Sequence, residues 1–508
     1  MLTLTQKDKE QLARRGINEG EFATQVDNLV KGFPYVKLAG AAAVGDGITT
    51  LSEPAIEQYA ALYESQRDHL HTVKFVPASG AASRMFKDMV DYHMQDGAVR
   101  IPGAEECLEN LRKFAFYDKL ASKLRKHDLR LEKLEEERRY VTISDFILHE
   151  QGLNYQKTPK AMVLFHNYPT GPRTAFEEHL VEGAAYARCE NDQVYLHFTI
   201  SPEHRALFEH KIHAVVKSYE EALGVTFHIE FSEQKPRTDM VSLDKNGHLV
   251  RDAEGDLLFR PGGHGSLIEN LNDIDADLIF IKNIDNVTVD RLRGTTVRYK
   301  MALAGYLLDL QQEVFRHLEL LESLSTSATH LAMIEGFAVQ RLGVKLDMGY
   351  YGKSAREKIL FWQRKLNRPI RVCGMVRNEG EPGGGPYWVA GKNNLPSLQI
   401  VEASQIDIHD EFQKKIVAKS SHFNPVDLVC ATKNYKGNPF NLNNYINPNT
   451  GFISTKKQNG IEMRIQERPG LWNGAMADWI TLFVEVPVET FTPVKTLADL
   501  LRPEHQES

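Results

Sequence analysis

Charged side chains stand beside strand-like apolar runs of the sequence. Lys160 directly precedes the apolar run 161–165, and Asp285 follows a second apolar run, 276–281. A lysine ammonium at the edge of a sheet is placed to meet a phosphate, and a carboxylate at the carboxyl end of a strand is where a hard cation is held. Another lysine, Lys495, lies near the C-terminus. These residue types are suited to chemistry on a phosphate group.

Two loops of small residues accompany these charges. The first follows the strand-like run 72–76, precedes a helical pattern and reads Pro77-Ala-Ser-Gly-Ala-Ala-Ser-Arg84. Backbone N–H groups of such a loop at a helix N-terminus can bind a phosphate or the edge of a base, and Arg84 adds a positive charge. The second loop, Arg260-Pro-Gly-Gly-His-Gly265, allows close approach of a ligand to the backbone. Each of these segments also has a purely structural interpretation, as a turn, a cap or a surface lysine.

The elements that must position these residues alternate along the chain. Strand-like runs at 72–76, 161–165, 193–200, 225–231 and 276–281 are separated by helical patterns that include 174–188 and 202–223. This alternation predicts an α/β fold with a mixed, mostly parallel sheet and helices on both faces.

The expected domain organisation has an N-terminal helical segment and one catalytic domain. Residues 1–70 contain three helical patterns, ended or opened by Gly16, Gly32 and Pro54. Residues 71–508 form the expected catalytic domain. The charged helical sequence at about 88–158 interrupts its β/α alternation, so we expect a helical insertion there.

The amino-acid composition limits the kinds of partner that we expect for this protein. The 508 residues include 61 basic and 68 acidic side chains, a net charge of −7, which lacks the basic excess that nucleic-acid binding requires. The four cysteines lie far apart and form no C-x-x-C pair, so neither a disulfide framework nor a structural zinc site is indicated. No run of eighteen apolar residues occurs. We therefore expect a cytoplasmic protein with neither nucleic acid nor membrane as partner.

Several of these segments resemble motifs of the UDP-sugar pyrophosphorylases, and within that family the UDP-glucose type most. The segment Pro261–Gly265 is similar to the family's PPGHG loop, and Lys282–Asn286 followed by Thr288–Asp290 resembles its SNIDN and TVD. The segment Phe491–Leu501 resembles its closing FLPVK-x-x-SDLL, and Phe231–Arg237 is a shorter echo of its F-x-Q-x-x-x-PR. Together the motifs run from about residue 75 to residue 501 in the family's order.

The resemblance implies a fold of the nucleotide-diphospho-sugar transferase type and a Mg²⁺-dependent reaction. A sugar-1-phosphate oxygen attacks the α-phosphorus of a nucleoside triphosphate, with UTP as the expected donor, and pyrophosphate leaves. No protein nucleophile is required, because positioning and charge neutralisation account for most phosphoryl-transfer catalysis.

The resemblance also implies roles for residues at each end of the substrates. The residues expected to bind the nucleotide are Ala78, Ser79, Gly80, Gln234, Gly263 and His264. The residues expected to face the sugar are Asn283, Glu402, Asn424 and Phe491. The residues expected to act on the phosphates are Arg84, Lys160 and Lys495, and Asp285 is the expected Mg²⁺ ligand.

The sequence departs from the family pattern in its first loop, where Ser79 and Ala82 replace glycines. Arg84 and Lys160 are close in sequence in the family but 76 positions apart here, so they meet only if the intervening segment returns to the same edge of the sheet. Membership of a bacterial family whose domain has no known function would explain this divergence from the UDP-sugar pyrophosphorylase pattern.

Two alternatives stay open. One is a glycosyltransferase that uses a nucleotide-sugar, although Asp285 is not part of a D-x-D motif. The other is a nucleotide-binding sensor without turnover, although a sensor does not need the charges that stabilise a transition state.

Overall fold

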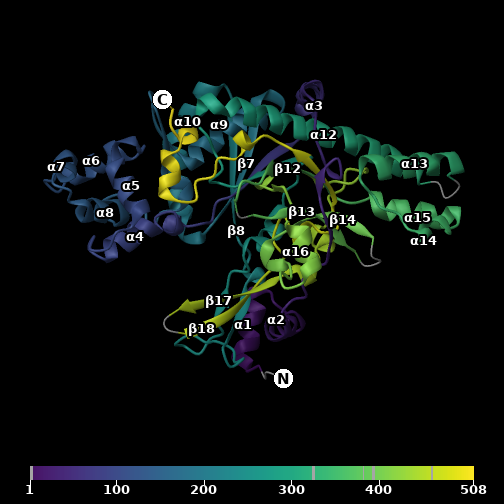
Figure 1. Cartoon of the computed structure of the whole chain (residues 1–508), viewed down its shortest axis with the longest axis horizontal. Helices are drawn as coiled ribbons and strands as arrows, with labels where there is room; N and C mark the ends of the chain where they lie inside the picture. Colours follow the sequence, from purple (N-terminus) through teal and green to yellow (C-terminus); the bar gives the residue numbers. More distant parts are fainter. Residues whose placement is uncertain (1–3, 323–325, 382, 392–394, 459–460, 508) are drawn as a thin grey trace. The chain divides into compact units, whose positions relative to one another are not determined.

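The computed structural model describes residues 4–322, 326–381, 383–391, 395–458 and 461–507, drawn in colour in Figure 1. The chain forms two compact units, each built from segments distant in sequence. Unit 1 comprises Met1–Ala55, Glu233–Ile279 and Leu303–Val486. Unit 2 comprises Ile56–Ser232, Phe280–Ala302 and Pro487–Ser508.

Unit 2 contains β4, β7, β8 as far as Ser232 and the part of β11 from Phe280 onward, and the strand order in the sheet is β11, β4, β7 and β8. Their bounds are Leu278–Lys282, Thr72–Pro77, Gln193–Ile200 and Thr226–Glu233. β4 pairs in parallel with β7, with Val73 opposite Tyr195 and Pro77 opposite Thr199. β4 and β11 are almost wholly buried, and this explains their continuous apolar sequence.

Helix α9 (Ala175–Tyr186) packs against β7 at short distance. A capping box between Thr174 and Glu177 starts the helix. Gly183 lets the helix approach the strand, because a Cβ there would lie 2.7 Å from Leu196 and 3.3 Å from Val194. The other long helices of this unit are α3 (Glu53–Gln66), α10 (Arg205–Leu223) and the first turns of α12 (Arg293–Leu320).

The segment 88–158 is helical, and Figure 1 shows its helices as one group. They are α4 (Lys87–Met94), α5 (Pro102–Glu109), α6 (Tyr117–Arg125), α7 (Leu131–Glu136) and α8 (Tyr140–Leu148). Their apolar side chains, such as Met89, Leu120 and Ile147, join the same core as Phe176 and Phe198. The insertion therefore packs as part of unit 2.

The prediction of a strand at 161–165 was wrong in its position. Residues Lys160–Met162 form a 3₁₀ helix, and β5 (Leu164–Tyr168) starts later and pairs with β6 (Gly171–Thr174) in a two-stranded hairpin. The apolar residues 161–163 are buried by core packing. Burial without ladder pairing gives the same apolar run as a strand, and so the sequence pattern could not separate the two.

Unit 1 contains a mixed sheet and two smaller antiparallel sheets. In the mixed sheet the order is β2 (Ala43–Val44), β3 (Gly47–Thr49), β19 (Ile480–Glu485), β12 (Ile370–Arg377) and β16 (Asp427–Ala431), and β15 (His422–Phe423) pairs with β12. β12 runs parallel to β19 and antiparallel to β16. The second sheet is β1 (Leu38–Ala41), β13 (Gly385–Ala390) and β14 (Pro396–Val401), and the third is β10 (Phe259–Arg260), β9 (Met240–Asp244), β18 (Ile461–Glu467) and β17 (Phe452–Gln458).

The helices of unit 1 begin with α1 (Gln6–Arg15) and α2 (Glu19–Lys31), which end at Gly16 and Gly32 as expected. Leu12, Phe22 and Leu29 pack against Val241 and Leu243 of β9, and Figure 1 shows both helices beside β17 and β18. The remaining helices are α11 (Ile268–Leu271), the rest of α12, α13 (Ala328–Arg341), α14 (Met348–Tyr351), α15 (Ala355–Leu366) and α16 (Glu411–Val417).

The predicted fold class is confirmed: the protein is α/β, with a mixed, mostly parallel sheet, N-terminal helices and helical insertions. The two compact units do not coincide with the expected domains, because each unit takes residues from both 1–70 and 71–508. The expected domain boundary stays a prediction. No helix within the described ranges is long and apolar enough to cross a membrane.

Candidate functional site

The small-residue loop after β4 is held by the segment that leads to Lys160. Ala82 N donates to Thr158 O at 3.0 Å, and Lys160 N donates to Gly80 O at 3.2 Å. Ala81 and Pro159 form an isolated antiparallel bridge. The helical insertion between residues 88 and 158 is thus an excursion whose two ends meet, and this brings the backbones of the Arg84 loop and Lys160 together.

Lys160 pairs with Asp285 and with the C-terminal segment. Its Nζ donates to Oδ2 of Asp285 and to the carbonyl oxygen of Val494, each at 2.9 Å. The backbone N–H of Val494 donates to Asp285 O at 3.0 Å, which closes the arrangement. The side chains of Lys160 and Asp285 keep 14% and 23% of their exposure, so a ligand from solvent can reach the pair.

Lys495 follows Val494 directly and is exposed. Its ammonium lies 5.7 Å from the centre of the Phe491 ring, a cation–π arrangement. Leu497 N donates to Met85 O at 3.0 Å and ties this segment to the residue after Arg84, whose side chain is exposed. Four segments far apart in sequence therefore converge in unit 2, and three cations and one carboxylate belong to them.

Of the other predicted residues in this unit, Ala78 is buried, Ser79 and Gly80 are exposed, and Asn283 is half-buried.

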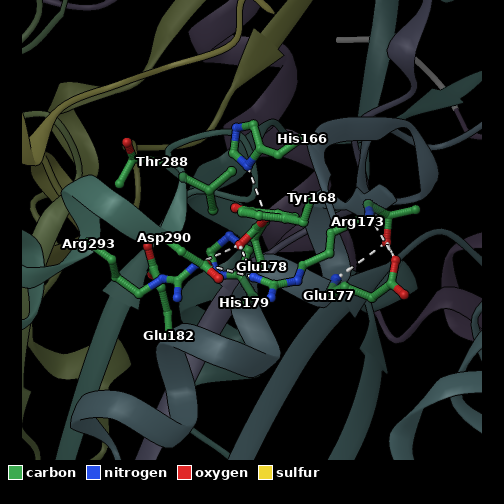
Figure 2. A network of polar contacts seen from close by, with 12 residues as sticks. His166, Tyr168, Arg173, Glu177, Glu178, His179, Glu182, Thr288, Asp290 and Arg293 are labelled. Atoms are coloured by element: carbon green, nitrogen blue, oxygen red, sulfur yellow. Dashed lines mark hydrogen bonds and ion pairs between the residues drawn. The ribbon is translucent and has the colours of Figure 1, made fainter. Parts of the chain in front are cut away.

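A buried polar network supports the segment that carries Asp285 (Figure 2). Asp290 accepts hydrogen bonds from Arg173, at 2.6 Å, and from Arg293. Burial disfavours the charge on Asp290, but the Arg173 hydrogen bond and the charge of Arg293 outweigh it, so the pKa of Asp290 is lowered. Glu178, fully buried, accepts from Arg293 at 2.9 Å and from Tyr168 at 2.8 Å. The network holds the chain just after Asp285 to α9 and to the β5–β6 hairpin.

A buried histidine, His179, holds the backbone of Ile284, the residue before Asp285. His179 Nε2 donates to Ile284 O at 3.1 Å, and burial lowers the pKa of His179, so the ring is neutral. Next to it, Glu182 accepts from Lys282 at 2.7 Å and from Lys74 at 3.0 Å. These supporting residues were not predicted, because buried charges on α9 have no local sequence pattern.

The second glycine loop lies in unit 1 and positions His264. Gly263 has φ +76°, which favours glycine. The His264 ring stacks on Trp472, with ring centres 4.3 Å apart, and Leu471 N donates to His264 Nδ1 at 3.2 Å. His264 Nε2 lies 3.7 Å from Glu402.

Glu402 also accepts from Asn473 Nδ2 at 2.6 Å. The interaction with His264 lowers the pKa of Glu402 most, and the Asn473 hydrogen bond lowers it further against the effect of burial. The structure thus brings two predicted residues, His264 and Glu402, into one polar cluster. Trp472 and Asn473 were missed; their only sequence signal is the glycine on each side, Gly470 and Gly474.

The remaining two predicted residues of unit 1 have structural partners. Gln234 donates to Asp239 at 3.2 Å, and Asp239 also pairs with Arg15 at 2.6 Å. Asn424 is buried, donates to Gly374 O at 2.9 Å, and accepts from Val426 N at 3.0 Å. The side chain of Asn424 therefore ties its loop to β12, and a contact with a sugar would require these bonds to open.

Unit 1 also contains a cavity of about 810 Å³, lined by residues that include Tyr35, Lys345, Trp388 and Trp479. None of the predicted site residues lines it. The cavity and the cluster of charged residues are therefore different candidate sites. We take the charged convergence in unit 2 as the candidate site, because chemistry on phosphates requires fixed charges.

Fold and site define an α/β protein whose fixed charges and backbone loops suit a phosphorylated ligand. The chain belongs to the family described as Domain of unknown function (DUF4301), whose model matches residues 5–506. This confirms the expected membership of a family without known function.

Solved structures similar to this chain come from Leishmania major and Trypanosoma brucei. A mutant UDP-glucose pyrophosphorylase from Leishmania major has 13% identity and a TM-score of 0.46, with 98% of this chain and 79% of that chain covered. The UDP-glucose phosphorylase from Trypanosoma brucei has 14% identity and a TM-score of 0.44, with 97% and 77% covered. Similarity at this distance assigns no role to any residue. A comparison with curated proteins finds no match.

Proposed function

We propose that this protein is a nucleotidyltransferase that transfers a nucleotidyl group, UMP from UTP in the first instance, to a sugar-1-phosphate and releases pyrophosphate. The observation that carries the proposal is the convergence of the Gly80 loop, Lys160, Asp285 and the segment of Lys495. The resemblance of these segments to UDP-sugar pyrophosphorylase motifs supports the choice of substrates.

In this proposal each cation has one place along the reacting phosphates. The backbone N–H groups of the Gly80 loop and the guanidinium of Arg84 bind the nucleotide. Lys160 neutralises charge on the triphosphate, and Lys495 holds the phosphate of the sugar. The new bond joins the sugar phosphate oxygen to the α-phosphorus, and the bond to the β-phosphate oxygen breaks as pyrophosphate leaves. Fixed cations favour this step because they act where charge develops and need no reorganisation.

The donor set at Asp285 fits Mg²⁺. This ion takes one or two protein carboxylates and completes its octahedral shell with waters and substrate phosphates. Among the described residues no group of three His, Cys, Asp or Glu side chains gathers at Asp285, so the nucleotide itself would supply further ligands. Bound there, Mg²⁺ would neutralise phosphate charge.

The test is pyrophosphate release from the purified protein with Mg²⁺, each of the four common nucleoside triphosphates and a panel of hexose-1-phosphates. We expect release that requires one nucleotide and one sugar phosphate together. Asp285→Asn should lower the rate about 100-fold or more. A matched control is Asp118→Asn, since Asp118 is exposed in the first turn of α6. Release that is equal in both variants would remove Asp285 from the site.

Lys495→Ala tests the acceptor end. We expect a raised KM for the sugar phosphate and little change in KM for the nucleotide, because only the acceptor loses its cation. Unchanged acceptor kinetics would contradict the assignment of Lys495. Nucleotide binding without release under any acceptor would instead support a glycosyltransferase or a sensor.

A further inference from the structure

A cluster of three side chains in the helical insertion has the composition of a transition-metal site. His93 comes from α4, and Asp145 with His149 comes from α8 and its C-terminal cap. One potential ligand atom of each lies within 4.8 Å of the others, and this is the only such group of His, Cys, Asp or Glu within the described part of the chain. Asp145 and His149 are four positions apart and so project from the same face of the helix.

The distances around Asp145 bracket those of a bound zinc ion. Its Oδ1 lies 2.7 Å from His149 Nδ1 and 3.7 Å from His93 Nε2. Tetrahedral ligands at about 2.0–2.1 Å from Zn²⁺ lie about 3.3 Å apart, midway between these values. The two imidazole ring centres are 5.0 Å apart at an interplanar angle of 66°. Two imidazoles on one tetrahedral ion have ring centres about 5 Å apart, so small side-chain rotations would complete the site.

The tautomer of His93 is an independent observation in favour of a cation. Ser144 Oγ donates its proton to Val141 O at 2.8 Å, so its oxygen can only accept from His93 Nδ1, 3.2 Å away. With a proton on Nδ1, the His93 ring turns the lone pair of Nε2 toward the Asp145 carboxylate. Two lone pairs face each other unless a proton or a metal ion lies between them. A histidine oriented by a hydrogen bond at its other nitrogen is the usual arrangement in metal sites.

The second carboxylate oxygen of Asp145 is also oriented, because it accepts a hydrogen bond from Gln151 Nε2. The side chains of His93, Asp145 and His149 keep 24%, 34% and 38% of their exposure. This leaves access for a water molecule as a fourth ligand. Two imidazoles and one carboxylate favour Zn²⁺ and related transition metals over Mg²⁺, which prefers oxygen ligands only.

We propose that His93, Asp145 and His149 bind one Zn²⁺ ion that cross-links α4 to α8. This site is separate in residues and in metal chemistry from Asp285, and it does not depend on the proposed reaction. Helix α4 begins three residues after Arg84, so the ion would fix the helix that leads out of the first loop.

The test is zinc retention by the full chain without an affinity tag, after equilibration with Zn²⁺ and dialysis, measured as metal per chain by mass spectrometry. We expect about one equivalent in the wild type and loss of that equivalent in His93→Gln and in His149→Gln. The matched control is His213→Gln, which changes an exposed histidine of α10 and should retain the ion. Circular dichroism of each zinc-free variant establishes that it is folded.

Ser144→Ala tests the positioning hydrogen bond. It removes the acceptor for His93 Nδ1–H without touching a ligand, and we expect zinc affinity to fall about tenfold. No zinc on the wild type, or equal zinc on the ligand variants and the His213→Gln control, would overturn the proposal.

Discussion

Glycines in the His264 loop show how single residues decide the shape of a site. A Cβ on Gly265 would lie 2.1 Å from Pro469 O and 2.9 Å from Arg468 O, both backbone atoms. A Cβ on Gly80, in the other loop, would meet nothing within 4 Å. The glycine at 265 is therefore required by close packing of two chain segments, whereas the glycine at 80 leaves open space beside the backbone.

We expect Gly265→Ala to destabilise unit 1 by about 1–3 kcal/mol, because the backbone of the 468–469 segment must move to admit the methyl group. The measurement is the midpoint of thermal unfolding. Gly294→Ala is the matched control, since Gly294 lies in the first turn of α12 with open space around it and alanine favours a helix. Equal midpoints for the two variants would contradict this account of Gly265.

At the scale of elements, the C-terminal 3₁₀ helix Pro503–His505 is docked on the β5–β6 hairpin by a histidine pair. His166 Nε2 lies 2.9 Å from His505 Nδ1, and His166 Nδ1 lies 2.9 Å from Glu178, as Figure 2 shows for the latter pair. Burial, and then the charge of His166, lower the pKa of His505 to about 3. The docked segment thus requires a neutral His505.

This lowered pKa predicts that acid weakens the docking. The folded pKa lies below the usual 6.5, so between these values the undocked state binds more protons, and stability falls as pH decreases from 6.5 toward 3. The loss should be about 1.4 kcal/mol at pH 5.5 relative to pH 7.5. Amide hydrogen exchange of residues 504–506 at the two pH values, corrected for the intrinsic rate at each pH, measures it.

The variant His505→Gln removes the titrating group and should make the protection of this segment, after correction for the intrinsic exchange rate, nearly independent of pH over that range. His213→Gln, on the surface of α10, should keep the wild-type dependence. The same pH dependence in His505→Gln would show that another group is responsible.

At the scale of the whole molecule, a nucleotide that binds only the folded chain must raise its thermal stability. The gain is about 2.7 kcal/mol when the ligand is present at 100 times its dissociation constant. We expect UTP with Mg²⁺ to raise the unfolding midpoint and Lys160→Met to lose most of this shift. Lys157→Met is the matched control, because Lys157 is exposed and pairs with Glu150 at the surface. Equal shifts in the two variants would argue against Lys160 as a nucleotide ligand.

The local elements of this protein could be predicted from its residues alone. The apolar runs at 193–200 and 276–281 became β7 and β11, and the glycines at 16 and 32 end α1 and α2. These features follow from side-chain periodicity and from backbone preferences, which act over a few residues.

Which of these elements come into contact could be seen only in the folded chain. Lys160 reaches Asp285 across 125 positions and Val494 across 334, and no local pattern encodes such contacts. The position of the strand expected at 161–165 was also wrong, because burial in the core and burial in a sheet require the same apolar sequence. The supporting charges of Glu178 and Glu182, and the histidines around Asp145, belong to the same class. The charges and hydrogen bonds of these residues depend mostly on partners that are distant in sequence and become neighbours only in the folded chain.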